Sequence, residues 1–121
     1  MRVLVIDDDQ HVHEFARLML ERWGHEILPR ADNGIQGEMF ARDHKPDIIL
    51  LDINMPVQDG WLTLKNLRAS GYAGDVYMLS ALPAGDNEMR ARRSGADGFI
   101  QKQEMYSELK RIVGGKAESG A

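Results

Sequence analysis

The chain has 121 residues, 43% hydrophobic and 28% charged, which is ordinary for one globular domain with a core of its own. Its 15 Lys and Arg against 19 Asp and Glu give a net charge of −4, which argues against broad binding to nucleic acids or anionic membranes. The absence of cysteine excludes disulfides, zinc–thiolate sites and thiol catalysis, and no apolar stretch approaches the roughly 18 residues of a membrane span.

Apolar runs and amphipathic stretches alternate along the chain. In order, we predict a strand at 2–6, a helix at 10–22, a strand at 25–28, a helix at 34–44, a strand at 47–51, a helix from 60 to Ser70-Gly71, a strand at 75–79, a helix at 84–94, a strand at 97–101 and a helix at 104–113. We expect one domain over residues 1–113 and a flexible tail or linker stub over residues 114–121.

Two of the expected helices have apolar faces that differ in strength. The helix at 34–44 follows Asn33, a favourable N-cap, and its buried face is expected to consist of Ile35, Met39 and Phe40. The helix at 84–94 has a thin apolar face, chiefly Ala84, Met89 and Ala91. Because helix stability comes mostly from packing, we expect this second helix to be loosely held.

Five strand–helix units with short connections predict an α/β fold with a parallel sheet, helices on both faces and right-handed crossovers. Pro29 cannot donate to a strand ladder, which places the second strand at the sheet edge and favours the doubly wound order 2-1-3-4-5. In that order the first and third strands are neighbours, and the ligand crevice lies at their carboxyl ends.

Carboxylates follow both of these strands. The run Val3–Ile6 ends in Asp7-Asp8-Asp9, and the run Ile48–Leu51 ends in Asp52, so the acidic side chains should meet in one pocket. A pair of carboxylates about 4 Å apart costs roughly 4 kcal/mol at an effective dielectric near 20, and a cation relieves that repulsion. Oxygen ligands with room for water suit Mg²⁺. The alternative is that Asp7–Asp9 merely cap the following helix.

Polar residues also follow the fourth and fifth strands. Ser80-Ala81 ends the fourth strand and Lys102 ends the fifth, so both face the same crevice in the predicted order. A hydroxyl and an ammonium there would suit an incoming phosphoryl group. The alternative is a turn serine and a solvated surface lysine. His11 and His13 are two apart on a helix, which makes a poor metal pair, and we expect them to be solvated.

Asp7-Asp8, Asp52, Ser80-Ala81 and Lys102, in that order and at strand ends, resemble the receiver domain of two-component response regulators, including the bacterial chemotaxis receiver. The stretch Ile49–Gly60 resembles the phosphorylation-site signature of that family, and Gly95–Phe99 resembles its entry into the fifth strand. The resemblance covers about residues 2–113 and implies the flavodoxin-like form of the doubly wound fold.

The resemblance implies a role for each matching residue. Asp52 would accept a phosphoryl group from the phosphohistidine of a sensor histidine kinase or a phosphotransfer protein. Asp8, Asp52 and the backbone carbonyl of Asn54 would bind Mg²⁺ directly, and Asp7 through water. The groups that contact the phosphoryl group or respond to it would be Ser80, Ala81, Lys102 and Phe99. Output would pass through the face formed by the fourth helix, fifth strand and fifth helix.

Two positions affect how well the pattern fits. Gln103 follows Lys102 where many receivers have a proline, often with a cis bond; since a cis non-proline bond costs about 3 kcal/mol, we expect a trans bond or an altered loop. Leu82 is apolar, and its bulk would shield a phosphoryl group from water, which predicts a phosphorylated state no shorter-lived than in receivers with polar residues there.

Two other functions compete with a signalling switch. One is a binding module of the same fold that works without phosphorylation, and Gln103 is its only support. The other is an enzyme, either an aspartyl phosphohydrolase or a flavin protein, but Asn54 replaces the second acid of the former and no Gly-rich phosphate loop supports the latter. We therefore do not expect an enzyme. We expect a cytoplasmic protein, because Met1-Arg2 lead straight into a strand. Arg90, Arg92 and Arg93 form a basic patch that we expect to be a solvated face, and the alternative is a docking surface for a partner or for a second copy in a homodimer.

Overall fold

The computed structural model describes residues 1–114, so the predicted tail lies outside the described residues apart from Gly114. The elements in chain order are β1 Arg2–Ile6, α1 Gln10–Arg22, β2 Glu26–Ile27, α2 Gly34–His44, β3 Ile48–Asp52, α3 Gly60–Ala69, β4 Asp75–Ser80, α4 Asn87–Arg93, β5 Gly98–Gln101 and α5 Met105–Leu109. A 3₁₀ turn over Lys102–Glu104 precedes α5, and a π-helical turn over Lys110–Gly114 follows it. No helix of this part of the chain is long and apolar enough to cross a membrane.

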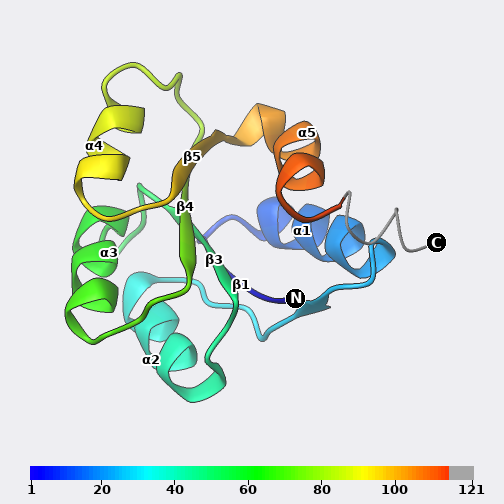
Figure 1. Cartoon of the computed structure of the whole chain (residues 1–121), viewed down its shortest axis with the longest axis horizontal. Coiled ribbons are helices and arrows are strands. Elements are labelled where there is room, and N and C mark those ends of the chain that lie inside the picture. The colour runs from blue at the N-terminus through cyan, green and yellow to red at the C-terminus, as the bar shows by residue number, and fades with distance from the viewer. Residues whose placement is uncertain (115–121) are drawn as a thin grey trace.

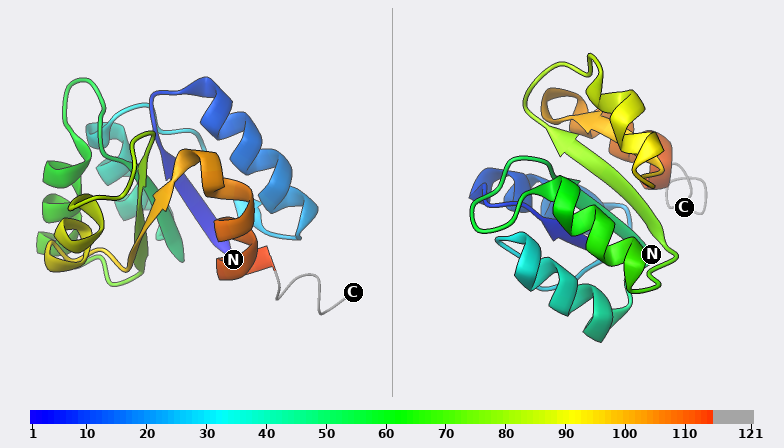
Figure 2. Two further views of the ribbon diagram at one scale, coloured as in Figure 1. Left: turned by 90° about the horizontal axis from the view of Figure 1, so that it is seen from above. Right: turned by 90° about the vertical axis from the view of Figure 1, so that its left-hand side faces the viewer.

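All five strands are parallel and lie in the order β2-β1-β3-β4-β5, which confirms the predicted topology. The helices α1 and α5 cover one face of the sheet, and α2, α3 and α4 cover the other (Figure 1). The right-hand view of Figure 2 looks onto the second layer, where α3 lies between α2 and α4. β1 pairs with β3 from Val3–Ile48 to Ile6–Leu51, so their carboxyl ends lie side by side.

The sheet is apolar on both faces because each face is covered by helices. Along β1, Val3 and Val5 pack toward α1 and α5, whereas Leu4 and Ile6 pack toward the layer of α2, α3 and α4. The four apolar residues of β3 alternate in the same way, and each is at most 2% exposed. This burial on both faces fixes the register that brings the strand ends together.

The apolar face predicted for α2 is wrong for two of its three residues. Ile35 and Met39 are 50% and 44% exposed, and Phe40 is only partly buried. The helix instead buries Gly37 together with its other small residues, and a Cβ on Gly37 would lie 2.4 Å from Cδ1 of Ile6. The backbone of α2 approaches β1 too closely for a large side chain, so Ile35 and Met39 point outward while Phe40 packs against the edge of the core.

Other elements are shorter than predicted. β2 has two residues, although an isolated bridge between Ile6 and Ala31 extends the pairing at the sheet edge. α4 has seven residues and buries only Ala91, while Met89 is 58% exposed, so the expectation of a thin apolar face is confirmed. These elements have few apolar residues to bury, which is why periodicity overestimated their length.

Candidate functional site

The carboxyl ends of β1 and β3 bring three carboxylates together. Asp7, Asp8 and Asp52 each offer an oxygen, and these oxygens lie within 4.8 Å of one another. Asp7 and Asp52 are 0% and 4% exposed, whereas Asp8 is on the surface. The predicted acidic pocket therefore exists, with two buried carboxylates at its floor and one at its mouth.

The capping interpretation is correct for the third aspartate. Asp9 is the N-cap of α1, and its carboxylate accepts a hydrogen bond of 2.8 Å from the backbone N–H of His11. This hydrogen bond holds the pKa of Asp9 below its ordinary value. The three consecutive aspartates thus divide between two tasks, since Asp9 holds the helix while Asp7 and Asp8 face the pocket.

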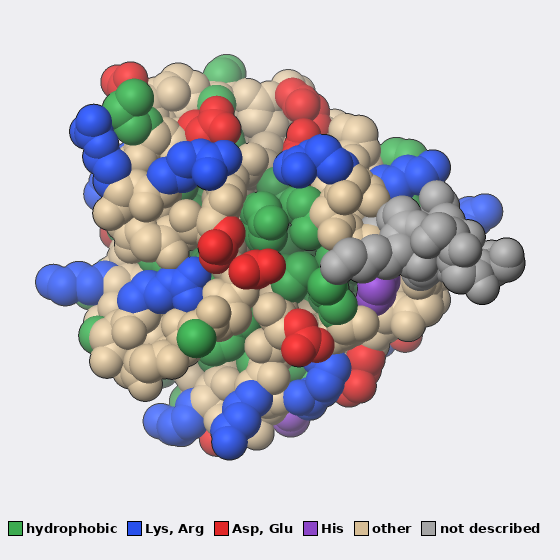
Figure 3. All heavy atoms as spheres, in the orientation of Figure 1, with side chains coloured by type: hydrophobic (Ala, Val, Ile, Leu, Met, Phe, Trp, Pro, Cys, Tyr) green, Lys and Arg blue, Asp and Glu red, His purple; other side chains and the backbone are tan. Residues whose placement is uncertain are grey.

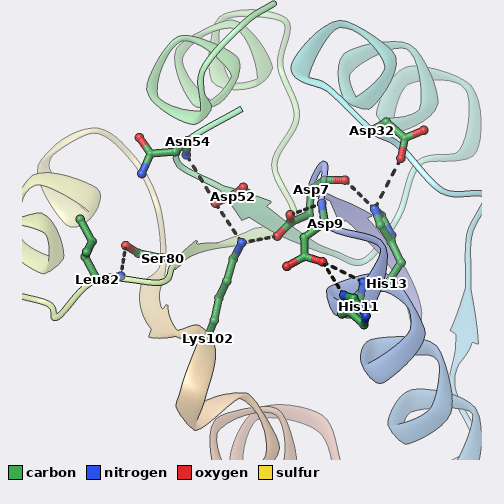
Figure 4. A network of polar contacts seen from close by, with 10 residues as sticks. All are labelled: Asp7, Asp9, His11, His13, Asp32, Asp52, Asn54, Ser80, Leu82 and Lys102. Atoms are coloured by element: carbon green, nitrogen blue, oxygen red, sulfur yellow. Dashed lines mark hydrogen bonds and ion pairs between the residues drawn. The ribbon is translucent and has the colours of Figure 1, made fainter. Parts of the chain in front are cut away.

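Lys102 reaches into the pocket from the end of β5 (Figure 4). Its Nζ lies 3.0 Å from Oδ2 of Asp7 and 3.4 Å from Oδ1 of Asp52, and its side chain is only 19% exposed. Burial acts to lower the pKa of Lys102, but the two carboxylates outweigh it and raise that pKa above its ordinary value. A solvated surface lysine does not describe this residue.

One positive charge does not neutralise the pocket. Burial first and the charge of Asp7 second raise the pKa of Asp52 to about 7, against the opposing effect of Lys102. Oδ1 of Asp7 accepts a hydrogen bond from the backbone N–H of Asp9, but its buried Oδ2 accepts none within the described residues. Excess negative charge beside a single ammonium and an all-oxygen donor set fit a divalent cation such as Mg²⁺.

The remaining predicted residues surround the pocket in different ways. The backbone N–H of Asn54 lies 3.4 Å from Oδ1 of Asp52. The Ser80 hydroxyl is buried and accepts a hydrogen bond of 3.1 Å from the N–H of Leu82, and Ala81 is exposed. Phe99 is half-buried and packs against the hydrophobic cluster that includes residues of α3 and α4.

The two positions that depart from the family pattern, Leu82 and Gln103, adopt ordinary conformations. No peptide bond of residues 1–114 is cis, so the trans bond expected between Lys102 and Gln103 is confirmed. The Leu82 side chain is 59% exposed and points away from Asp52 (Figure 4), so it does not cover the pocket in this conformation. Its predicted effect on the lifetime of a phosphorylated state stays a prediction.

Two features that position the pocket were missed from the sequence. His13 is 8% exposed, not solvated, and its Nε2 donates to the backbone oxygen of Asp7 at 2.6 Å. Its spacing from Ala16 and Leu20, three and seven residues on, was the available signal. Gly60 allows α3 to begin against β3, because a Cβ there would lie 2.2 Å from the backbone oxygen of Asp52.

Residues 3–114 match the family described as the response regulator receiver domain. The probable C4-dicarboxylate response regulator DctR of Priestia megaterium is 34% identical over 112 residues, which cover 92% of this chain and 49% of DctR. BvgA of Bordetella pertussis, described as a putative positive transcription regulator of virulence factors, is also 34% identical, over 89% of this chain and 52% of BvgA. The chain therefore spans about half the length of these curated relatives.

Solved receiver-domain structures share the fold of this chain. The receiver domain of the Francisella response regulator 1452 superposes with a TM-score of 0.85 at 29% sequence identity, covering 99% of this chain and 98% of that one. The receiver domain of the putative response regulator NarL from Mycobacterium tuberculosis gives the same TM-score and identity over 97% of this chain and 95% of that one. The sheet order and the acidic pocket at its carboxyl edge thus occur on the scaffold of a known family.

Proposed function

Because the chain belongs to the response regulator receiver family, a signalling module rather than a catalytic enzyme, we propose that it is a switch controlled by phosphorylation of Asp52. The observation that carries this proposal is the pocket itself, where a buried Asp52 lies among Asp7, Asp8 and Lys102. An acidic pocket of this kind is typical of phospho-accepting response regulators.

The proposed reaction is a transfer of the phosphoryl group to the Asp52 carboxylate. An oxygen of Asp52 attacks the phosphorus of a donor phosphohistidine, and the new O–P bond forms as the P–N bond breaks. The electron pair of the broken bond leaves with the donor imidazole. Lys102, which holds its proton beside Asp52, favours the ionised nucleophile and then contacts the phosphoryl oxygens.

Mg²⁺ is the proposed cofactor. The side chains of Asp8 and Asp52 and the backbone carbonyl of Asn54 would hold it directly, and Asp7 would do so through water. When bound, it would offset the repulsion among the carboxylates and the charge of the phosphoryl oxygens. The convergence of the three carboxylates, which one ammonium does not neutralise, and the raised pKa of Asp52 support this assignment.

Ser80 and Phe99 would carry the signal away from the pocket. The Ser80 hydroxyl accepts a hydrogen bond from the N–H of Leu82 in this structure. On phosphorylation it would turn toward the phosphoryl group, and the exposed Ala81 would move with it and draw the loop before α4 inward. Phe99 would change rotamer as that loop moves, and the face of α4, β5 and α5 would provide output. The short, weakly packed α4 supports a rearrangement of modest cost.

The proposed phosphoryl donor is a sensor histidine kinase or a phosphotransfer protein, since receiver domains partner with histidine kinases. The receptor of the signal is a downstream protein, an output domain or a second copy. We also propose that the receiver ends near residue 113, although half of each curated relative lies outside the matched region.

Incubation of the protein with acetyl phosphate and Mg²⁺, followed by intact mass measurement, tests the proposal. We expect the mass increase of one phosphoryl group, its loss in Asp52→Asn and in EDTA, and its retention in Asp43→Asn, a matched change at an exposed carboxylate on α2. Wild type that stays unlabelled at saturating donor and Mg²⁺ would contradict the proposal and favour the phosphorylation-independent binding module.

A further inference from the structure

A groove between α3 and α4 lies outside the phosphoryl pocket, and its α4 wall adjoins the predicted output face of α4, β5 and α5. It has a volume of about 550 Å³, and the residues that line it include Trp61, Leu62, Lys65 and Arg90. Arg93 and Met89 line a second hollow on the other side of Arg90. We call these six residues the α3–α4 groove.

The groove collects more cations than carboxylates, because the exposed Asp59 and Asp86 are the acidic residues that line its two hollows. Lys65, Arg90 and Arg93 form no ion pair with any carboxylate of residues 1–114. Their neighbours differ, because Arg68 pairs with Asp97 at 3.0 Å and Arg92 with Glu88 at 3.9 Å. Figure 3 shows Lys and Arg side chains over α3 and α4 at the left of the molecule, although the chain as a whole carries a net charge of −4.

Apolar groups lie beside these cations. Leu62 on α3 and Met89 on α4 are 47% and 58% exposed. The guanidinium of Arg90 lies 4.2 Å from the ring centroid of the half-buried Trp61, a cation–π contact that keeps both groups at the floor of the groove. Exposed apolar side chains within a rim of unpaired charge are typical of a surface that binds a protein partner.

We propose that the α3–α4 groove binds an acidic amphipathic helix of a partner protein. Such a helix would place aliphatic side chains against Leu62 and Met89 and carboxylates against Lys65, Arg90 and Arg93, the helix-in-groove arrangement. Charge complementarity selects this partner. A nucleic acid would leave the apolar groups without contacts and would be repelled by a chain of net charge −4.

The test uses the whole chain, labelled with ¹⁵N, and two synthetic helical peptides of about 18 residues with leucines at i, i+3, i+4 and i+7. One peptide carries glutamates at the remaining positions and the other carries lysines. We expect the acidic peptide alone to shift the Trp61 indole signal and the amides of α3 and α4, while the indole of the buried Trp23 stays in place as an internal reference.

Charge reversal supplies the matched comparison. Lys65→Glu with Arg93→Glu should weaken binding of the acidic peptide by about tenfold or more. Arg22→Glu, at an exposed cation of α1 that also lacks an ion pair in residues 1–114, should change it less than about twofold. Equal shifts with both peptides, shifts confined to other helices, or undiminished binding to the doubly reversed variant would each overturn the proposal.

Two further arms separate this proposal from its competitors. A single-stranded oligonucleotide and phosphatidylglycerol vesicles should leave the Trp61 indole unshifted, and tighter binding of either than of the acidic peptide would overturn the assignment. Asp52→Asn should bind the acidic peptide as wild type does, because Asp52 is absent from the groove. Asp52→Asn therefore tests phosphorylation, and the doubly reversed variant of Lys65 and Arg93 tests docking, so the two proposals can fail independently.

Discussion

At the scale of single residues, the site is a balance between two buried carboxylates and one ammonium. Lys102 lies between Asp7 and Asp52, yet the pKa of Asp52 is still raised to about 7. The unfolded chain would ionise this residue near 3.8, so folding without a metal retains a proton over the range between these values. Ionised Asp52 therefore lowers the stability of the metal-free protein, whereas a neutral residue at this position would not.

Asp52→Asn should stabilise the metal-free protein at alkaline pH. Because the folded pKa is raised, wild type keeps its full stability below pH 4 and loses up to about 4 kcal/mol as pH rises from about 4 to about 7. The variant lacks this loss, so in EDTA at pH 8 its free energy of unfolding should exceed that of wild type by about 2–4 kcal/mol.

Urea unfolding in EDTA across this pH range checks that expectation. The gap between Asp52→Asn and wild type should close toward pH 4, and Mg²⁺ at pH 8 should narrow it by stabilising wild type. Asp43→Asn, at an exposed carboxylate of α2, should follow the wild-type profile. A gap that is constant with pH would show that Asp52 is not protonated in the folded state near neutrality.

The sequence located this site because carboxylates after two buried strands must meet once those strands are neighbours. Asp7, Asp8 and Asp52 met as predicted, and Lys102 joined them. What the sequence did not reveal was the partner of each group: the bond from His13 to the Asp7 carbonyl depends on how α1 is rotated over β1, which no local pattern specifies.

At the scale of elements, two loops at the ends of the central strands β3 and β4 have large effects on local stability. The loop after β3 contains Val57, which is 77% exposed and has a φ of 70°, a left-handed conformation that β-branched residues rarely adopt. The loop before β4 is held by Arg68. The first loop therefore stores backbone strain, and the second is held chiefly by the Arg68 guanidinium, together with the Tyr72 hydroxyl that donates to Pro46.

Val57→Asn should stabilise the protein by about 1 kcal/mol, because asparagine tolerates the left-handed region at lower cost and the exposed valine loses little packing. Thermal unfolding at fixed pH measures the change. Val57→Ala, which removes the branch but not the Cβ, should give a smaller gain. A lower melting temperature for Val57→Asn would show that the loop does not keep this conformation in solution.

Arg68→Ala should destabilise the protein by about 2 kcal/mol or more, since it leaves several acceptors unpaired. Its guanidinium donates to the carbonyls of Tyr72, Gly74 and Gly95 at 2.8–2.9 Å and pairs with Asp97. Chemical denaturation measures the loss. Lysine lacks the planar fork, so Arg68→Lys should recover only part of it, whereas Lys65→Ala on the exposed side of α3 should cost little.

At the scale of the whole molecule, stability is unevenly distributed over the helices. α3 buries Leu64 and Leu67 in the core, whereas α4 buries only Ala91. Elements with few buried apolar contacts open at lower free energy than the rest of the structure. The helix next to the Ser80 loop is thus the one expected to open first.

Native-state hydrogen exchange should show this difference. The amides of α4, Asn87–Arg93, should exchange at least about 100-fold faster than the core amides of α3, and without global unfolding. The amides of β3, which lie at the centre of the sheet, provide the reference for global opening. Equal protection of α3 and α4 would contradict the view that α4 is loosely held.

The architecture was predictable because apolar strands and amphipathic helices alternate five times along the chain, and Pro29 indicated which strand lies at the edge of the sheet. The failure at α2 has a physical cause: periodicity finds a stripe of large apolar residues but cannot weigh it against a stripe of small ones that lets two backbones approach. There the tertiary distance between α2 and β1, not side-chain size, decided which face was buried.

The inverted face of α2 changes how variation in this helix should be interpreted. A saturation mutagenesis scan would find that charged residues are accepted at the hydrophobic positions Ile35 and Met39. Even one added methyl group would be rejected at Gly37, where it would clash with Ile6. Surface redesign for higher solubility can therefore begin at Ile35 and Met39, because these large apolar side chains are exposed and are not part of the core.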